Sequence, residues 1–276
     1  MMISRSKLKF HETFQPEVAY LAKVCELAAK EYSGDKYAIS EQTGIPTGKQ
    51  KGKVEPHIKY ANYMGLIDYT VEKGVYSLVL SQLGKEVFSQ DCFLHENLTH
   101  WICHYCISRE EVGAPQWAYI VHTGHSGYSQ VNSSPYHLTK VNDLYRANVG
   151  FEEMFGVVRR SYIEGFFSDL NYINWDDGIE YIEHVERPEL LFVYAYALFD
   201  SWERRFPNRK EITITELIAS IELGKIFNLS EVEIDSILDE LAYEGLIKVN
   251  RQLYPGTIIR LSSSSEIIPR VYSLLL

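Results

Sequence analysis

The tripeptide Gly-Leu-Ile occurs twice in this chain, at residues 65–67 and again at residues 245–247. Each copy follows a segment in which apolar residues recur every three or four positions, the spacing of an amphipathic helix. Each copy also begins a pair of β-rich runs separated by a glycine-containing turn, which is the pattern of a hairpin. A repeat of this kind, at a period of about 180 residues, indicates two related domains rather than a solenoid.

The first copy is predicted to hold three helices and a hairpin, at residues 16–32, 37–43, 53–63 and 65–81. The second copy is predicted to hold helices at 213–221 and 231–243 and a hairpin at 245–261. Ser230 and Glu233 have the spacing of a capping box before the second of these helices. Helices followed by a hairpin are the order of a winged helix-turn-helix, although any small α+β domain could show the same order.

We therefore predict an α+β fold, mostly α, in which two winged helix-turn-helix-like domains flank a helical middle region. The expected boundaries are 1–90 for the N-terminal domain, 91–208 for the middle region and 209–276 for the C-terminal domain. Helical patterns at 96–108 and 188–205 fall in the middle region. A chain of 276 residues can bury such a core without disulfides or a structural metal.

Composition and targeting signals indicate a cytoplasmic protein without a membrane span. The longest apolar runs, such as residues 190–199, are shorter than the roughly 20 residues that cross a bilayer. No apolar stretch follows the basic residues of the first ten positions, so no secretory signal is expected. The four cysteines are typical of reduced thiols. Cys103 and Cys106 have Cys-x-x-Cys spacing, but they lie in an apolar helical segment, which favours core packing over zinc.

The charge of the chain is unevenly distributed. The net charge of −10 argues against nucleic acid, because an acidic surface repels phosphate. Residues 1–60, however, hold ten basic residues against seven acidic ones, so the excess negative charge belongs to the remainder of the chain. A nucleic-acid surface is therefore expected near the N-terminus.

A lysine cluster opens the third predicted helix. Lys49, Lys51 and Lys53 alternate with small or polar residues, and His57 and Lys59 follow one and two turns later. In a helix-turn-helix this position meets phosphates and base edges, and lysine suits sequence-tolerant phosphate contact. We expect these residues to bind double-stranded DNA, with the three lysines making about three phosphate contacts. A solvated lysine loop without a ligand is the alternative.

The corresponding helix of the second copy is acidic. Its charged residues are Glu231, Glu233, Asp235, Asp239, Glu240 and Glu244. Such a face repels phosphate, so the second copy is expected to dock a protein or to form a homodimer, unless Lys248, Arg251 and Arg260 of its hairpin reach the DNA backbone.

Two groups of residues suit phosphodiester hydrolysis, which needs carboxylates that hold Mg²⁺ or Mn²⁺, or a side chain that moves a proton. His11 and Glu12 are the first candidates for catalysis. The second group is Asp176, Asp177, Glu180, Glu183 and His184. Neither spacing is diagnostic: His11 and Glu12 could cap the first helix, and an acidic group often marks a helix N-terminus. The lysine cluster lacks P-loop spacing, and no organic cofactor is expected.

Several segments resemble a bacterial domain family of unassigned function. They are 9–14, with His-Glu-Thr-Phe as its most specific part, 44–49 through Tyr60 to 65–67, 80–84 with 100–104, and 188–202. Members of the family commonly sit beside genes for DNA phosphorothioation. The family includes the SspB component of the Ssp system, a phage-defence pathway that places sulfur in one strand of the DNA backbone.

The resemblance implies a DNA-binding protein that nicks one strand so that partner enzymes can insert sulfur. The implied partners are a cysteine desulfurase, an ATPase and a sulfurtransferase-like enzyme. His11 and Glu12 lie in the segment that matches best. The chain departs from the family pattern at 50–52, where it has extra residues, and at His57 and Lys59, where arginine or a similar residue is expected. A non-catalytic transcriptional regulator or assembly adaptor, with one domain for DNA and the acidic one for protein, is the alternative hypothesis.

Overall fold

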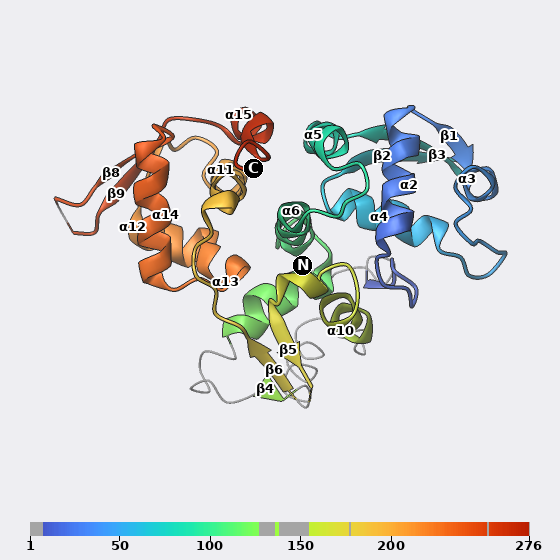
Figure 1. The fold of residues 1–276 in the computed structure, drawn as a ribbon, viewed down its shortest axis with the longest axis horizontal. Helices are drawn as coiled ribbons and strands as arrows, with labels where there is room; N and C mark the ends of the chain where they lie inside the picture. Colours follow the sequence, from blue (N-terminus) through green and yellow to red (C-terminus); the bar gives the residue numbers. More distant parts are fainter. Residues whose placement is uncertain (1–7, 127–135, 138–154, 177, 253, 276) are drawn as a thin grey trace. The chain divides into compact units, whose positions relative to one another are not determined.

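The chain forms two compact units, Met1–Ile182 and Glu183–Leu276, here called unit 1 and unit 2. The computed structural model describes residues 8–126, 136–137, 155–176, 178–252 and 254–275. Both units combine helices with small three-stranded antiparallel sheets (Figure 1), which confirms the predicted mixture of helix and strand. No described helix has the length and apolar character that a bilayer crossing requires. The finer division at residues 90 and 208 stays a prediction.

Unit 1 begins with a helix, a short strand, two helices and a hairpin. In chain order these are α2 (Val18–Ala29), β1 (Ser33–Asp35), α3 (Lys36–Thr43), α4 (Val54–Tyr63), β2 (Ile67–Glu72) and β3 (Val75–Leu80). The strands lie in the order β1-β3-β2, and both pairs are antiparallel. A further helix, α5 (Gln82–Gln90), follows β3 directly.

The ends of these elements follow from particular side chains. The Asp35 carboxylate accepts hydrogen bonds from the backbone amides of Tyr37 and Ala38 and so caps the N-terminus of α3. Gly44 ends the same helix in the left-handed conformation, with φ of 70°, where a side chain would be strained. Gly65 has φ of 74° and turns the chain from α4 into β2 in the same way.

The start of α5 is docked against the start of β2. Ser81 caps α5 by accepting from the Gly84 amide, and its own amide donates to the Leu66 carbonyl over 3.1 Å. A Cβ atom placed on Gly84 would lie 1.7 Å from that same carbonyl oxygen. Because no side chain fits such a gap, glycine is required where the two segments meet.

The core of unit 1 is organised around α6 (Asn97–Ser108), in which every residue after Asn97 is buried. Cys103 and Cys106 are buried thiols of this helix that form no disulfide, and burial raises the pKa of Cys103 well above its usual range. Both belong to the core, as the sequence predicts. The His104 Nδ1 atom and the Tyr162 hydroxyl are 2.7 Å apart and join α6 to α10 (Phe155–Ile163) by a buried hydrogen bond.

The remaining elements of unit 1 are short. They are α7 (Pro115–Ala118), η1 (Tyr119–Gly124), η2 (Ser168–Leu170) and the strands β4 (Tyr136–His137), β5 (Ile173–Trp175) and β6 (Gly178–Tyr181). These strands form a second antiparallel sheet in the order β4-β6-β5.

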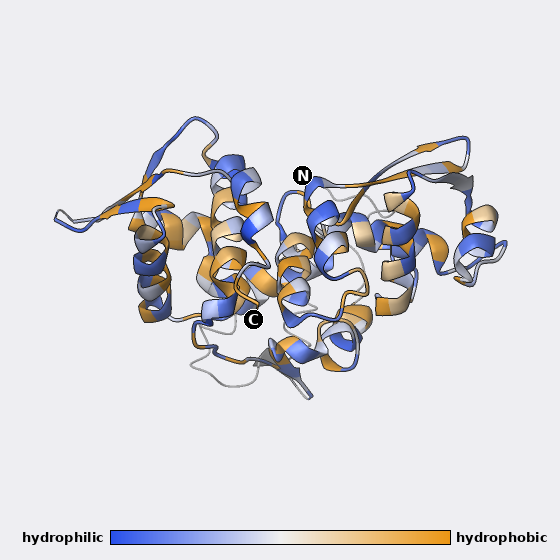
Figure 2. Ribbon diagram, turned by 45° about the horizontal axis from the view of Figure 1, so that its top comes forward, coloured by the Kyte–Doolittle hydropathy of each residue, from blue (hydrophilic) through white to orange (hydrophobic). Residues whose placement is uncertain are grey.

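Unit 2 repeats the element order of the first part of unit 1. Its elements are η3 (Pro188–Leu190), α11 (Leu191–Arg205), β7 (Glu211–Thr213), α12 (Ile214–Glu216), η4 (Leu217–Ile221), α13 (Leu223–Phe227), α14 (Glu231–Tyr243), β8 (Ile247–Asn250), β9 (Thr257–Arg260), α15 (Ser264–Ile267) and η5 (Ile268–Arg270). The strand order β7-β9-β8 matches β1-β3-β2. Helices of both units carry an apolar side and a polar side (Figure 2), as their sequence period predicts.

The predicted capping box of α14 is only half formed. The Ser230 hydroxyl accepts from the Glu233 amide, as expected. The Glu233 carboxylate, however, accepts from the Glu186 amide over 2.6 Å instead of reaching back to Ser230. A tertiary partner at the start of unit 2 thus replaces the local one.

Candidate nucleic-acid interface

The lysine loop, residues 46–53, is a tight turn between α3 and α4. The Lys53 amide donates to the Pro46 carbonyl over 2.8 Å and closes it. A Cβ on Gly52 would lie 2.5 Å from the Thr47 hydroxyl, and a Cβ on Gly48 would lie 2.9 Å from the Lys51 carbonyl. The two glycines therefore let the backbone fold back on itself and hold the lysines between them at a bend.

Two of the three predicted phosphate ligands in this loop stand in solvent. Lys49 and Lys51 are exposed, and neither has an ion-pair partner among the residues that the structure describes. Their ammonium groups are therefore available to an anion. This arrangement agrees with the surface that the sequence predicts for these two positions.

The Lys53 ammonium already has partners within the protein. It lies 2.7 Å from the Glu17 carboxylate and above the rings of Phe14 and Tyr20, at 5.6 Å and 5.3 Å from their centroids. The side chain is half-buried by these contacts. Lys53 thus ties the loop to the segment that precedes α2, and its charge is largely balanced within the protein.

His57 does not lie on the surface where the sequence places it. The ring is completely buried in α4; its Nε2 accepts from the Glu17 amide over 3.1 Å, and its Nδ1 lies 2.6 Å from the Lys53 carbonyl. Burial lowers the pKa of His57 to about 4, so the ring is neutral at pH 7. His57 supports the start of α4 and is not accessible to DNA, so its predicted role as a DNA-binding residue is wrong.

Helix α4 offers only a narrow strip to solvent. Its residues that are not buried are Glu55, Lys59, Asn62 and Tyr63. The Glu55 carboxylate accepts from the Tyr76 hydroxyl over 2.5 Å and lies 3.7 Å from the Lys36 ammonium. Lys59, by contrast, has no ion-pair partner among the described residues.

His11 and Glu12 face different surroundings although they are adjacent. His11 is completely buried against Phe10 and Trp117, and its Nε2 lies 3.4 Å from the Gln116 amide nitrogen. Burial, and then the nearby positive charge of Arg160, lower the pKa of His11 to about 4. Glu12 is half-buried, and the Gly52 amide donates to its carboxylate over 3.4 Å. The fold therefore places Glu12, and not His11, beside the lysine loop.

Arg160 is a cation near this segment that sequence reasoning missed. It comes from α10, and its guanidinium donates to the Thr13 carbonyl over 2.9 Å, across a separation of 147 residues. The segment 11–17 thus contacts the lysine loop through Glu12 and Glu17, and α10 through Thr13. No local pattern signals this contact, because it arises only from tertiary packing.

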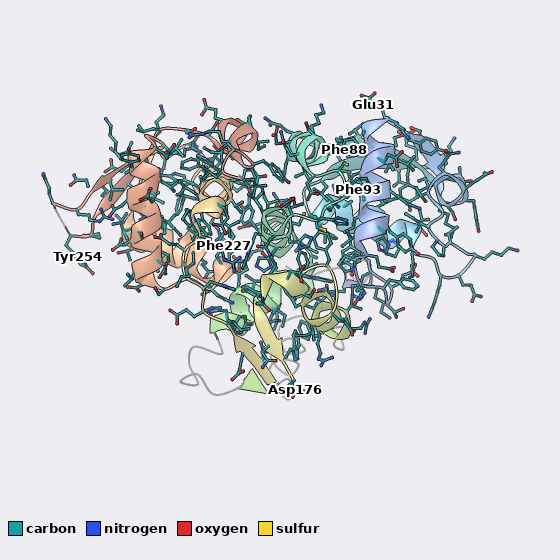
Figure 3. The ribbon with its side chains drawn as sticks, in the orientation of Figure 1. Glu31, Phe88, Phe93, Asp176, Phe227 and Tyr254 are labelled. Atoms are coloured by element: carbon teal, nitrogen blue, oxygen red, sulfur yellow. The ribbon has the colours of Figure 1, made fainter. Side chains whose placement is uncertain are left out.

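The second acidic group predicted for catalysis is not gathered into a site within one unit. Asp176 is exposed directly after β5 (Figure 3), and Asp177 lies outside the described residues. Glu180 belongs to β6 of unit 1, whereas Glu183 and His184 belong to unit 2. Within either unit, no three described His, Cys, Asp or Glu side chains bring their ligand atoms within 4.8 Å of one another.

The positive charges of the arginines around the hairpin of unit 2 are balanced by carboxylates of the protein itself. Arg251 pairs with Asp239 at 2.6 Å and with Asp235 at 3.5 Å. Arg260 pairs with Glu203, and Lys248 is exposed on β8. Val232 and Tyr243 of α14 are exposed to solvent. Tyr254, which follows β8, is also exposed (Figure 3).

Comparison with known proteins identifies the fold. No family model matches the chain, and no curated protein matches its sequence. A magnesium ion-bound SspB crystal structure matches with a TM-score of 0.70 and 15% identity, over 98% of this chain and 91% of that chain. An SspB crystal structure matches with a TM-score of 0.72 and 15% identity, over 96% and 88%. The chain has the SspB fold.

The SspB fold extends over nearly the whole chain and includes both units. It confirms, at the level of the fold, the resemblance that the segments 9–14, 44–49, 65–67, 80–84, 100–104 and 188–202 suggest. At 15% identity the likeness to SspB concerns the fold alone, so the roles of individual residues rest on the geometry of this chain.

Two buried histidines make the stability of unit 1 depend on pH. The pKa of His11 and of His57 is about 4 in the folded chain, against 6.5 for an ordinary histidine. The unfolded chain therefore binds more protons, and stability falls from pH 6.5 down to 4. We expect each histidine to contribute about 2 kcal/mol to the loss of stability between pH 8 and pH 5.

Urea unfolding at a series of pH values measures this loss. In the His57→Gln variant the free energy of unfolding should fall less steeply between pH 6.5 and pH 5. The difference in slope should correspond to close to one proton fewer taken up on unfolding. Replacing the exposed His95 by Gln serves as the control. Plots of the free energy of unfolding against pH that run parallel for the wild type and His57→Gln would contradict the low pKa of His57.

Proposed function

We propose that this chain is a DNA-binding component of a phosphorothioate modification system for phage defence. The single observation that carries the proposal is the SspB fold over 98% of the chain. The exposed Lys49 and Lys51 give that fold a surface on which a phosphate backbone can lie. The proposed setting is the cytoplasm, with double-stranded DNA as ligand and a cysteine desulfurase, an ATPase and a sulfurtransferase-like enzyme as partners.

The DNA-binding domain in this proposal is a winged helix-turn-helix. Its support is the element order of α2 to β3 and the strand order β1-β3-β2, which unit 2 repeats from α11 to β9. Because α4 is mostly buried, contact through the lysine loop would dominate over base reading by the helix. Such a domain would bind DNA with little sequence preference.

The finer proposal is that the chain nicks one strand so that sulfur can be inserted. One structure of the same fold is described as magnesium ion-bound. In this chain the described residues of unit 1 hold no three-ligand cluster, and the available carboxylate beside the loop is that of Glu12. Mg²⁺ is often held by one or two carboxylates together with substrate phosphates, so Glu12 suits a metal that binds with DNA. Such binding requires no preformed metal cage.

Within this proposal Glu12 and His11 have different roles. Glu12 reaches the loop, where a phosphate would be bound, and unlike Glu17 it is not paired with Lys53. His11 is buried and neutral at pH 7, so it acts as a positioning residue that fixes the segment leading to Glu12. This modifies the expectation that both residues take part directly in catalysis.

Incubation of supercoiled plasmid with the full chain, with Mg²⁺ or Mn²⁺ and with EDTA, tests nicking. Relaxed circles that form only with the metal and disappear in Glu12→Gln are the expected result. Glu31→Gln, at an exposed position after α2, is the matched control and should nick as the wild type does. Because a contaminating nuclease would be equally active in every variant, equal activity in Glu12→Gln would count against the proposal.

A non-catalytic adaptor is the second candidate, and one feature of unit 2 favours it. Val232 and Tyr243 on α14 are 77% and 87% exposed among the acidic side chains of that helix. An apolar and acidic face of this kind suits docking to a basic partner protein or to a second copy. Intact plasmid at high protein concentration, together with retained DNA binding, would favour the adaptor over the nickase.

A further inference from the structure

A cavity of about 530 Å³ opens in unit 1 at the C-terminal end of α4. It is lined by Phe10, Lys59, Asn62, Tyr63, Tyr69, Glu111 and Val112. The volume lies within the range of small-molecule sites. Lys59, Asn62 and Tyr63 are three and four positions apart in α4, so one face of the helix supplies all three.

The aromatic side chains of the cavity are held in place by packing. The rings of Phe10 and Tyr63 meet edge to face, with their centroids 4.8 Å apart. Tyr63 and Tyr69 are both half-buried and line the same cavity, and burial, followed by the neighbouring Tyr69, raises the pKa of Tyr63. Three rings therefore offer faces or edges to a planar ligand.

Several polar groups of the cavity are unused by the protein. Among the described residues, the Lys59 ammonium and the hydroxyls of Tyr63 and Tyr69 have no hydrogen-bond or ion-pair partner. The Asn62 amide nitrogen donates to the Ile67 carbonyl over 2.8 Å, which leaves its oxygen as an acceptor. A partly buried cavity that combines unused donors and acceptors with aromatic walls is suited to a ligand that has both kinds of group.

The polar groups restrict the class of ligand. One ammonium matches a single phosphate better than a polyphosphate, and the aromatic walls suit a planar heterocycle. The Asn62 amide oxygen is an acceptor of the kind that binds base edges. A nucleotide has all of these features, whereas an apolar peptide would leave the polar groups unpaired.

The cavity also lies along the helix that begins at the lysine loop. Ten residues separate Lys53 from Tyr63, which is about 15 Å of helix. At 3.4 Å per base step this is the length of roughly four steps of a DNA strand. A strand with its phosphates on Lys49 and Lys51 would thus have a nucleotide within reach of the cavity.

We propose that this cavity binds a single unstacked nucleotide, with the base against Tyr63 and Tyr69 and the phosphate at Lys59. The nucleotide can come from a distorted DNA duplex or from free mononucleotide. The first source rests on the proposed DNA-binding function, and the second is independent of it.

Two measurements on the full chain separate these sources. In the first, anisotropy gives the dissociation constants for an end-labelled duplex that is fully paired and for the same duplex with one A·A mismatch. An extruded base costs less to unpair at a mismatch, and stacking on aromatic side chains adds to its binding. We expect the mismatched duplex to bind roughly 5- to 150-fold more tightly. In the second, calorimetry measures the binding of dAMP alone.

The variants are Tyr69→Leu, which removes one ring, and Lys59→Gln, a half-buried change that leaves the walls intact. Each should reduce the mismatch preference or the dAMP affinity by at least about fivefold. In Tyr69→Leu, which removes no charge, the affinity for the paired duplex should stay within about twofold of the wild type. Tyr37→Leu, at a tyrosine that is 50% exposed on α3, is the matched control and should change neither.

The outcomes are distinct. If the protein prefers the mismatched duplex and Tyr69→Leu loses that preference, the cavity binds a nucleotide extruded from DNA. If the protein shows no mismatch preference but binds dAMP, and Tyr69→Leu loses dAMP binding, the cavity binds free mononucleotide. If dAMP binds and Tyr69→Leu loses this binding, but no duplex binds to the protein, this inference is supported and the proposed function is overturned. Duplex binding with neither mismatch preference nor dAMP binding, or a preference that survives in both cavity variants, overturns the inference and leaves the proposed function in place.

Discussion

Replacement of Lys49 and Lys51 by alanine is expected to weaken binding to a DNA duplex about 30-fold at 0.15 M salt. Each lysine that neutralises a phosphate contributes about 0.9 to the slope of log K against log salt, so the double variant should lose about 1.8 from that slope. The loss in affinity is then largest at low salt and disappears near 1 M. Fluorescence anisotropy with a labelled duplex at four or five salt concentrations measures both quantities.

The controls for this experiment come from the same unit. Lys30 and Lys85 are also exposed, so the variant that replaces both by alanine has the same net charge as the loop variant. It should keep the wild-type slope if position matters more than total charge. The same 30-fold loss in the control would show that the loop has no special role.

Lys53 should behave differently from its two neighbours. Sequence reasoning counts three phosphate contacts in the loop, but the Lys53 ammonium is paired with Glu17 at 2.7 Å. Its removal would leave the salt slope nearly unchanged and would loosen the segment before α2. The structure therefore reduces the expected electrostatic contribution from three lysines to two.

The helices of the chain could be predicted closely where their apolar stripes are long. The expected helix at 231–243 coincides with α14, and the one at 53–63 begins one residue before α4. The expected helix at 213–221 begins one residue before α12 and continues through η4. In each segment the apolar residues that define the period also contact the core, so pattern and packing agree.

The short strands β1 and β7 could not be predicted in the same way. Ser33–Asp35 has neither β-branched nor aromatic residues, and it is a strand only because β3 pairs with it from Val75 to Ser77. Glu211–Thr213 is likewise ordered by β9. A strand of three residues depends on a partner that is distant in sequence, so no local signal identifies it.

The residues of the candidate interface also fall into two groups: those whose position could be predicted from local sequence, and those whose position depends on tertiary packing. Lys49 and Lys51 are exposed because Gly48 and Gly52 allow the tight turn that places them at its bend. Both glycines can be recognised in the sequence as turn residues. The burial of His57 and the contact between Arg160 and Thr13 come from segments that meet only in the folded unit. Residue type and spacing therefore predict the exposed cations, whereas the function of the histidines could be judged only in the structure.

The repeated Gly-Leu-Ile segment explains why the two parts of the chain share a pattern. In unit 1 the Leu66 carbonyl accepts from the Ser81 amide, and in unit 2 the Leu246 carbonyl accepts from the Leu261 amide over 3.0 Å. The end of each hairpin thus returns to the residue just before its first strand. In unit 1 this junction also holds α5, through Ser81 and Gly84.

Substitution of Gly84 by alanine should therefore destabilise unit 1 by at least about 3 kcal/mol. The added methyl group would lie 1.7 Å from the Leu66 carbonyl oxygen, and the atoms that must move belong to the backbone at the start of β2. Chemical unfolding followed by tryptophan fluorescence gives the free energy. Gly156→Ala in α10 is the matched control, since its Cβ would lie no closer than 3.8 Å to a neighbouring atom.

The control is expected to unfold at the wild-type denaturant concentration or slightly above it, because alanine in a helix is favoured over glycine by about 0.5–1 kcal/mol. A Gly84→Ala variant as stable as the wild type would mean that α5 can move away from β2 at little cost. The Gly84 contact could then not be what holds α5 against the start of β2.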